Sequence, residues 1–162
     1  VQFKVEVNEK ELLEMLYEYY SQKYHFNGKL WFEKNGTSPS ALAFLLRKKI
    51  SFPVKIFCSR KGNISLLEYF RNELKVLPII HCQVLYPEIG MTKPEGHYMV
   101  YGGFDKRNKK ISLFNPSIGR GWEYYSEKEF LKMWETKGEK WWLVVLTKGV
   151  KVDAQKCRGK YL

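Results

Sequence analysis

The chain has 162 residues, the length of a single domain, of which 44% are apolar and 28% charged. This composition is that of a globular protein and excludes an intrinsically disordered chain. The formal net charge of +11 favours nucleic acid, an anionic membrane or acidic partners. No stretch approaches the roughly 18 apolar residues of a transmembrane helix, so no membrane span is expected. The sequence leaves the cellular compartment open.

Helical patterns dominate the first half of the chain. Asn8 is a good N-cap and Glu11 follows three residues later, as in a capping box, so a helix is predicted from Asn8 to the region of 24–28. Ser38 followed by Pro39 predicts the start of a second helix. A strand is expected over 52–58 and a third helix over 64–74.

Strand patterns dominate the second half. β-branched and aromatic residues over 76–86 predict a strand, and 95–104 with 110–114 read as a hairpin around a polar turn. A short helix over 127–135 and a strand over 141–147 follow. Helices first and antiparallel strands second indicate an α+β fold. We expect one domain over 1–147 and a basic C-terminal tail over 148–162.

The common motifs of catalysis and cofactor binding are absent from the sequence. It holds no phosphate-binding loop, no dinucleotide fingerprint, no His-Glu-x-x-His and no Gly-x-Ser-x-Gly. The three histidines are far apart in sequence, so neither a metal nor a cofactor is expected. Cys58 and Cys82 lie in apolar runs and are predicted to be small buried residues, while Cys157 lies in the tail. Whether any of them pair is left open.

His97 and Asn115 are the most informative polar residues. His97 starts the first strand of the predicted hairpin and Asn115 ends the second, just before Pro116. The hairpin brings these two strand ends together, so we predict a hydrogen bond between the side chains. An Asn that accepts from one ring nitrogen leaves the other to face a nucleophile. The alternative is a structural histidine beside a turn-forming Asn.

The blocks Leu77–Ile80, Gly96–Gly103, Ile111–Gly119 and Tyr125–Trp134 together resemble the papain-like peptidases that process bacteriocins by cutting double-glycine leader peptides. The resemblance implies a papain-like α+β fold, with an N-terminal helical half packed on an antiparallel sheet or half-barrel and a cleft between them. It places His97 and Asn115 at the catalytic His and Asp positions, and Gln2 at the Gln that helps form the oxyanion hole. Gly96 and Tyr98 would border the substrate. The nucleophilic Cys is replaced by Asn8.

The replacement at Asn8 decides the expected function. An amide cannot act as a nucleophile, and losing the nucleophile costs on the order of 10⁶-fold in rate in serine proteases. We therefore expect a degenerate peptidase-like domain that binds an extended, acidic peptide or protein segment in the remnant cleft. One alternative is an active peptidase or amide hydrolase with an unconventional nucleophile. Another is a nucleic-acid-binding domain built on Lys-rich patches and the exposed aromatic residues Trp31, Trp122 and Trp141.

Overall fold

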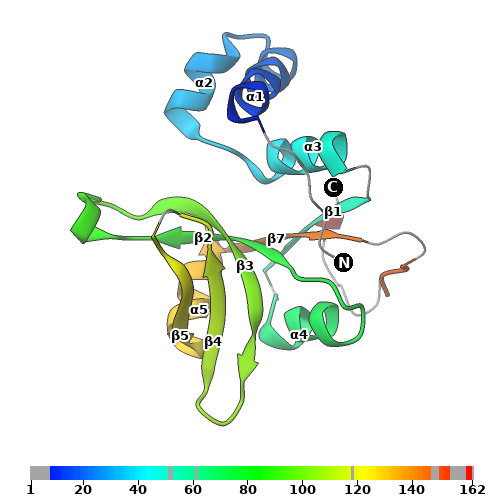
Figure 1. The fold of residues 1–162 in the computed structure, drawn as a ribbon, viewed down its shortest axis with the longest axis vertical. Coiled ribbons are helices and arrows are strands. Elements are labelled where there is room, and N and C mark those ends of the chain that lie inside the picture. The colour runs from blue at the N-terminus through cyan, green and yellow to red at the C-terminus, as the bar shows by residue number, and fades with distance from the viewer. Residues whose placement is uncertain are drawn as a thin grey trace. The chain divides into compact units, whose positions relative to one another are not determined.

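The computed structural model describes residues 8–50, 53–60, 62–117, 119–146, 150–153 and 160–161. The chain divides into two compact units, Val1–Val54 and Lys55–Leu162, and each is described by itself. The first is helical and the second is built on a sheet (Figure 1). The α+β class predicted from the sequence is confirmed.

The first unit contains three helices, α1 (Glu9–Tyr24), α2 (Gly28–Asn35) and α3 (Pro39–Ile50). The predicted cap is confirmed, because the side-chain oxygen of Asn8 accepts from the Glu11 backbone N–H at 3.3 Å. Helix α2 was not predicted. It depends on a close approach to α1, since a Cβ atom at Gly28 would lie 1.8 Å from the backbone oxygen of Tyr17.

Tyr20 is the centre of the helical core. Its ring is fully buried with Leu16, Ala41 and Leu45. Its hydroxyl donates to the Gly36 carbonyl at 3.0 Å and accepts from the Ser38 backbone N–H at 2.8 Å. One tyrosine therefore fixes the connection into α3.

The second unit is an open sheet in the order β5-β4-β3-β2-β7-β1-β8, with β6 paired to β7. The central hairpin is β3 (Glu95–Asp105) and β4 (Lys110–Asn115), flanked by β2 (Ile79–Val84) and β5 (Gly121–Ser126). The remaining strands are β1 (Val54–Ser59), β6 (Glu135–Thr136), β7 (Glu139–Val145) and β8 (Lys160–Tyr161). β2 to β5 pair antiparallel in succession, which leaves β5 at one edge.

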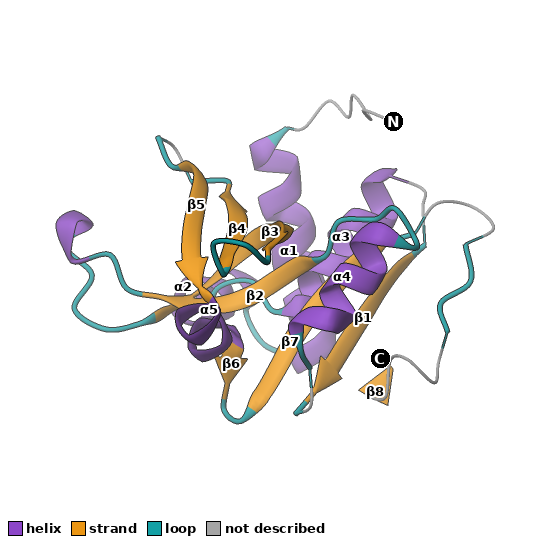
Figure 2. Cartoon of the chain, turned by 90° about the horizontal axis from the view of Figure 1, so that it is seen from below, coloured by secondary structure: helices purple, strands orange, loops and turns teal. Residues whose placement is uncertain are grey.

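Helices α4 (Ile64–Asn72) and α5 (Glu127–Trp134) share one core with the sheet. α5 lies beside β2, β5 and β6 (Figure 2). Ser126 caps α5 in a complete capping box, and the fully buried Trp134 packs edge to face against Trp142. A short 3-10 turn, Pro87–Ile89, follows β2.

The cysteine predictions are confirmed where they can be compared. Cys58 and Cys82 are both buried in strands of this unit. Cys157 lies outside the described residues. Two tail residues, Lys160 and Tyr161, pair with β1 as strand β8.

Candidate functional site

His97 and Asn115 are on neighbouring strands and share the core side of the sheet. Val100 of β3 pairs with Phe114 of β4, so His97 becomes a diagonal neighbour of Asn115 across the ladder. The Nε2 atom of His97 lies 2.9 Å from the Oδ1 atom of Asn115. The hydrogen bond predicted from the sequence is confirmed.

The hydrogen bonds of Asn115 fix its orientation. Its NH₂ group donates to the Tyr86 hydroxyl at 2.9 Å and to Glu123 Oε1 at 3.1 Å, so Oδ1 faces His97. Oδ1 also accepts from the Ser117 backbone N–H at 3.0 Å. An amide oxygen can only accept, so the network assigns the proton of neutral His97 to Nε2 and a lone pair to Nδ1. With only 1% of Asn115 exposed, this arrangement is held rigidly.

Glu123 of β5 is the centre of the polar network behind Asn115. The hydroxyls of Tyr86 (3.0 Å) and Tyr125 both donate to its Oε2 atom. Burial raises the pKa of both tyrosines, and hydrogen bonding to the Glu123 carboxylate raises it further. Both hydroxyls therefore remain protonated donors at neutral pH.

Arg120 neutralises this acidic centre. Its Nη1 atom lies 3.4 Å from Glu123 Oε1, and its Nη2 atom forms an ion pair with Glu88. The guanidinium carbon sits 3.7 Å from the centroid of the Tyr86 ring. The sequence analysis did not identify Arg120, Glu123 or the two tyrosines. No local pattern in Gly121–Ser126 indicated a strand, and Glu123 is placed near Asn115 only by the pairing of β5 with β4.

The side chain of His97 can accept a hydrogen bond at its Nδ1 atom. Within the described part of the chain, Nδ1 of this half-buried ring has no hydrogen-bond partner. The Ser117 hydroxyl lies 3.4 Å from Nε2, the protonated nitrogen, so His97 cannot take its proton. Ser117 is thus not activated as a nucleophile.

Cys82 pairs with His97 across β2 and β3 but has the wrong chemistry for catalysis. Burial, reinforced by the charge of Glu123, raises the pKa of the Cys82 thiol to about 12. Its sulfur lies 3.5 Å from the backbone carbonyl oxygen of His97. A buried, protonated thiol is inert.

Gly96 and Tyr98 alternate with His97 along β3 and therefore face the other side of the sheet. Both pack against His81: the Tyr98 and His81 ring centroids are 5.0 Å apart, and a Cβ at Gly96 would lie 2.7 Å from His81 Nε2. Burial, and secondarily the charge of His97, lower the pKa of His81. The binding role predicted for Gly96 and Tyr98 stays a prediction.

Two further residues of the predicted site belong to the N-terminal unit. Gln2 lies outside the described residues. The side chain of Asn8 caps α1, which is a structural use of its amide oxygen. That both border the same cleft as His97 stays a prediction.

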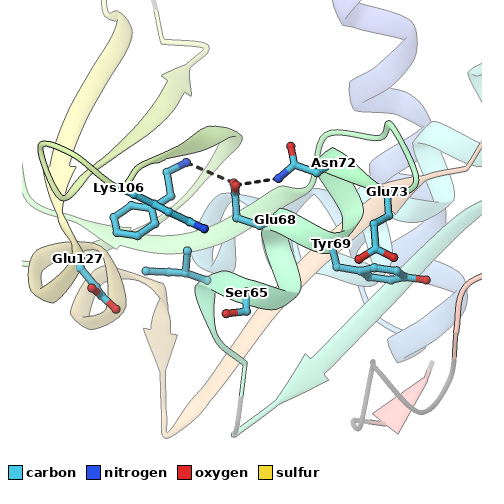
Figure 3. Close-up of a pocket in the computed structure, with 9 residues that line it drawn as sticks. Ser65, Glu68, Tyr69, Asn72, Glu73, Lys106 and Glu127 are labelled. Atoms are coloured by element: carbon cyan, nitrogen blue, oxygen red, sulfur yellow. Dashed lines mark hydrogen bonds between the residues drawn. The ribbon is translucent and has the colours of Figure 1, made fainter.

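A separate pocket of about 340 Å³ lies beside α4 (Figure 3). Its central carboxylate, Glu68, accepts from the Tyr101 hydroxyl at 2.9 Å, the Phe104 backbone N–H at 3.3 Å and the Asn72 amide at 2.9 Å. The bonds from Tyr101 and Phe104 attach α4 to β3, and the bond from Asn72 lies within α4. Glu68 is therefore committed to the fold, and we assign the pocket no chemistry.

The expectations about metals, membranes and aromatic surfaces can be compared with the structure. Among the described residues, no group of three or more His, Cys, Asp or Glu side chains could hold a metal ion. No helix in the described ranges has the length and apolar character needed to cross a membrane.

Of the three tryptophans named for nucleic acid, Trp31 packs in the helical core, Trp141 is partly buried and Trp122 is 54% exposed.

Comparison of the chain with protein-family models, with curated proteins and with solved structures gives no match.

Proposed function

We propose that this chain is a papain-like domain that binds a peptide segment without cutting it. The proposal takes the helical unit and the sheet as the two halves of that fold, with a cleft bordered by Asn8 and His97. The observation that supports it is the 2.9 Å contact between His97 and Asn115, because a histidine oriented by an Asn is two thirds of a papain-type triad. With an amide at position 8, a ligand is held and not hydrolysed.

The site suits an extended segment, and the charge of the whole chain favours acidic side chains in that segment. The lone pair on His97 Nδ1 can accept a backbone N–H, which every extended peptide offers. Arg120 beside the site is already paired with Glu88 and Glu123, so the attraction for acidic side chains comes from the basic surface of the chain as a whole. The net charge of +11 attracts acidic ligands over a longer range.

The test is a fluorescence anisotropy titration of labelled ten-residue peptides with the full chain. An acidic peptide should bind, and a variant of the same length with every acid replaced by its amide should bind more weakly. His97→Ala removes one hydrogen bond and should weaken binding of the acidic peptide by about 2- to 12-fold. Mass spectrometry of the peptide after long incubation should show it intact.

The matched control is His25→Asn. His25 is an exposed histidine in the left-handed C-cap of α1, a conformation that Asn also tolerates. This variant should bind the acidic peptide like the unmodified chain. Cleavage of the peptide, or equal binding by the His97→Ala variant, would contradict the proposal.

A further inference from the structure

The side of the sheet opposite the buried core carries an exposed aromatic cluster on β4 and β5. The cluster consists of Phe114, Trp122 and Tyr124, which are 39%, 54% and 64% exposed. Phe114 and Trp122 are cross-strand partners, with ring centroids 5.5 Å apart in an edge-to-face arrangement. Tyr124 is paired with Ser112 on the same face. Three large exposed aromatic side chains on adjacent strands form a contiguous apolar patch, and such patches mark interaction sites.

Gly102 lets the Trp122 ring lie across the sheet. A Cβ atom at Gly102 would stand 2.4 Å from Cζ3 and 2.9 Å from Cη2 of the Trp122 indole. Trp122 therefore reaches from β5 over β4 to the backbone of β3. An indole supported by the sheet and still more than half exposed provides a preformed stacking surface.

The hairpin turn next to this cluster is strongly basic. Four exposed basic residues lie within five positions of the turn and the start of β4: Lys106, Arg107, Lys109 and Lys110. The one acid of the turn, Asp105, is engaged locally, because it accepts from the backbone N–H groups of Arg107 and Asn108 and from the Asn108 amide. Its carboxylate thus stabilises the turn that presents the cations.

A groove connects the basic turn to the aromatic cluster. It has a volume of about 520 Å³ and is lined by Asp105, Asn108, Lys110, Ser112 and Tyr124. Lys110, Ser112 and Phe114 alternate along β4 and point to the same side of the sheet. Lys110 of the basic turn therefore lines the same groove as Tyr124 of the aromatic cluster.

We propose that this surface binds single-stranded nucleic acid. Bases stack on Trp122 and Tyr124, and the basic hairpin contacts the phosphates. Proteins that bind single strands without sequence preference combine these two elements, a basic groove and aromatic platforms. The net charge of +11 complements a polyanion. This surface is distinct from the His97 site, which lies on the other side of the sheet.

The test is an anisotropy titration of a labelled 12-nucleotide oligothymidine with the full chain at several salt concentrations. The logarithm of the association constant should fall with the logarithm of salt by about 0.7 for each phosphate contacted. Trp122→Ala should weaken binding roughly 5- to 150-fold, as expected for the loss of one stacked base. Trp122→Phe should keep most of the affinity that Trp122→Ala loses. That result would show that the Trp122→Ala effect comes from loss of the aromatic ring and not from loss of the fold.

Matched controls separate stacking and charge from general effects. Phe26→Ala removes an aromatic side chain that is 59% exposed outside this cluster and should leave binding unchanged. Lys106→Gln with Arg107→Gln should lower the salt slope by about 1.4, since two phosphate contacts are lost. Lys29→Gln with Lys34→Gln has the same net charge and should leave the slope as it is.

The following results would overturn the proposal: no binding at low salt, unchanged binding by the Trp122→Ala variant, or equal effects of the two charge-matched double variants. Poly-glutamate that competes as well as oligothymidine would point to an acidic protein partner instead. A Trp122-dependent dimer in sedimentation would assign the cluster to a second copy of the chain. The His97→Ala variant should bind oligothymidine normally, so failure of either proposal is distinguishable from failure of the other.

Discussion

Replacing Asn115 by Asp tests the polar network around His97. The Asn115 NH₂ group donates to Glu123 Oε1 at 3.1 Å, so an Asp would place a carboxylate oxygen against another carboxylate. The repulsion at this distance is about 1.3 kcal/mol in water and about 5 kcal/mol at an effective dielectric constant of 20. Because Arg120 partly neutralises Glu123, we expect a loss of about 2–4 kcal/mol in the free energy of unfolding at pH 7. This repulsion is a physical reason for an Asn rather than an Asp at position 115.

The loss of stability caused by Asn115→Asp should be larger at neutral pH than at acidic pH. Glu123 would raise the pKa of the new carboxyl group above its unfolded value, so the folded state binds a proton more readily than the unfolded state. The free energy of unfolding of the variant is then furthest below that of the unmodified chain when the pH is above the raised pKa of the new carboxyl group. The difference shrinks as the pH falls toward about 4. Urea denaturation of the variant and of the unmodified chain, at pH 7 and at pH 4.5, measures this difference in the free energy of unfolding at both pH values.

A second substitution should rescue the variant. Glu123→Gln in the Asn115→Asp background supplies an amide that can donate to the new carboxylate, so the double variant should recover at least about 1 kcal/mol. An Asn115→Asp variant as stable as the unmodified chain at pH 7, or a double variant no better than the single one, would refute this account of the network.

Three further predictions concern the packing of the sheet unit. Glu68→Ala should lower the free energy of unfolding by about 1–3 kcal/mol in urea, because the buried Tyr101 hydroxyl loses its acceptor; no change would show that the bond is dispensable. Cys82, whose thiol pKa burial raises to about 12, should resist iodoacetamide in the native chain at pH 8 and react after unfolding; rapid native labelling would contradict its burial. Ser126→Ala removes the capping box with Glu129 and should cost about 0.5–2 kcal/mol by thermal or urea denaturation; unaltered stability would mean that the cap contributes nothing.

Local signals in the sequence predicted most of the elements. The caps at Asn8 and Ser126 mark the starts of α1 and α5, because a cap satisfies backbone groups within three residues of itself. Two strand-like segments on either side of a polar turn predicted the β3–β4 hairpin. The hydrogen bond between His97 and Asn115 followed from that hairpin alone.

The parts missed by the sequence analysis depend on tertiary contacts. α2 is short, and its start at Gly28 relies on contact with α1. β5 follows a turn in which Gly119 and Gly121 both have positive φ, so the segment reads as a loop until its pairing with β4 is known. Glu123 belongs to that strand, and its role behind Asn115 could not be found without it.

The position of Asn8 relative to His97 tests the central claim most directly. If α1 begins at the His97 site, as the proposed function requires, the thiol of the Asn8→Cys variant should have a lowered pKa and react with iodoacetamide much faster than Cys82. Losing the Asn cap costs about 0.5–2 kcal/mol, which a domain of this size tolerates. Peptide mapping after brief labelling measures the rate at position 8, with and without His97→Ala. We predict selective alkylation that His97→Ala slows; labelling at an ordinary thiol rate, unaffected by His97→Ala, would contradict a shared papain-like site.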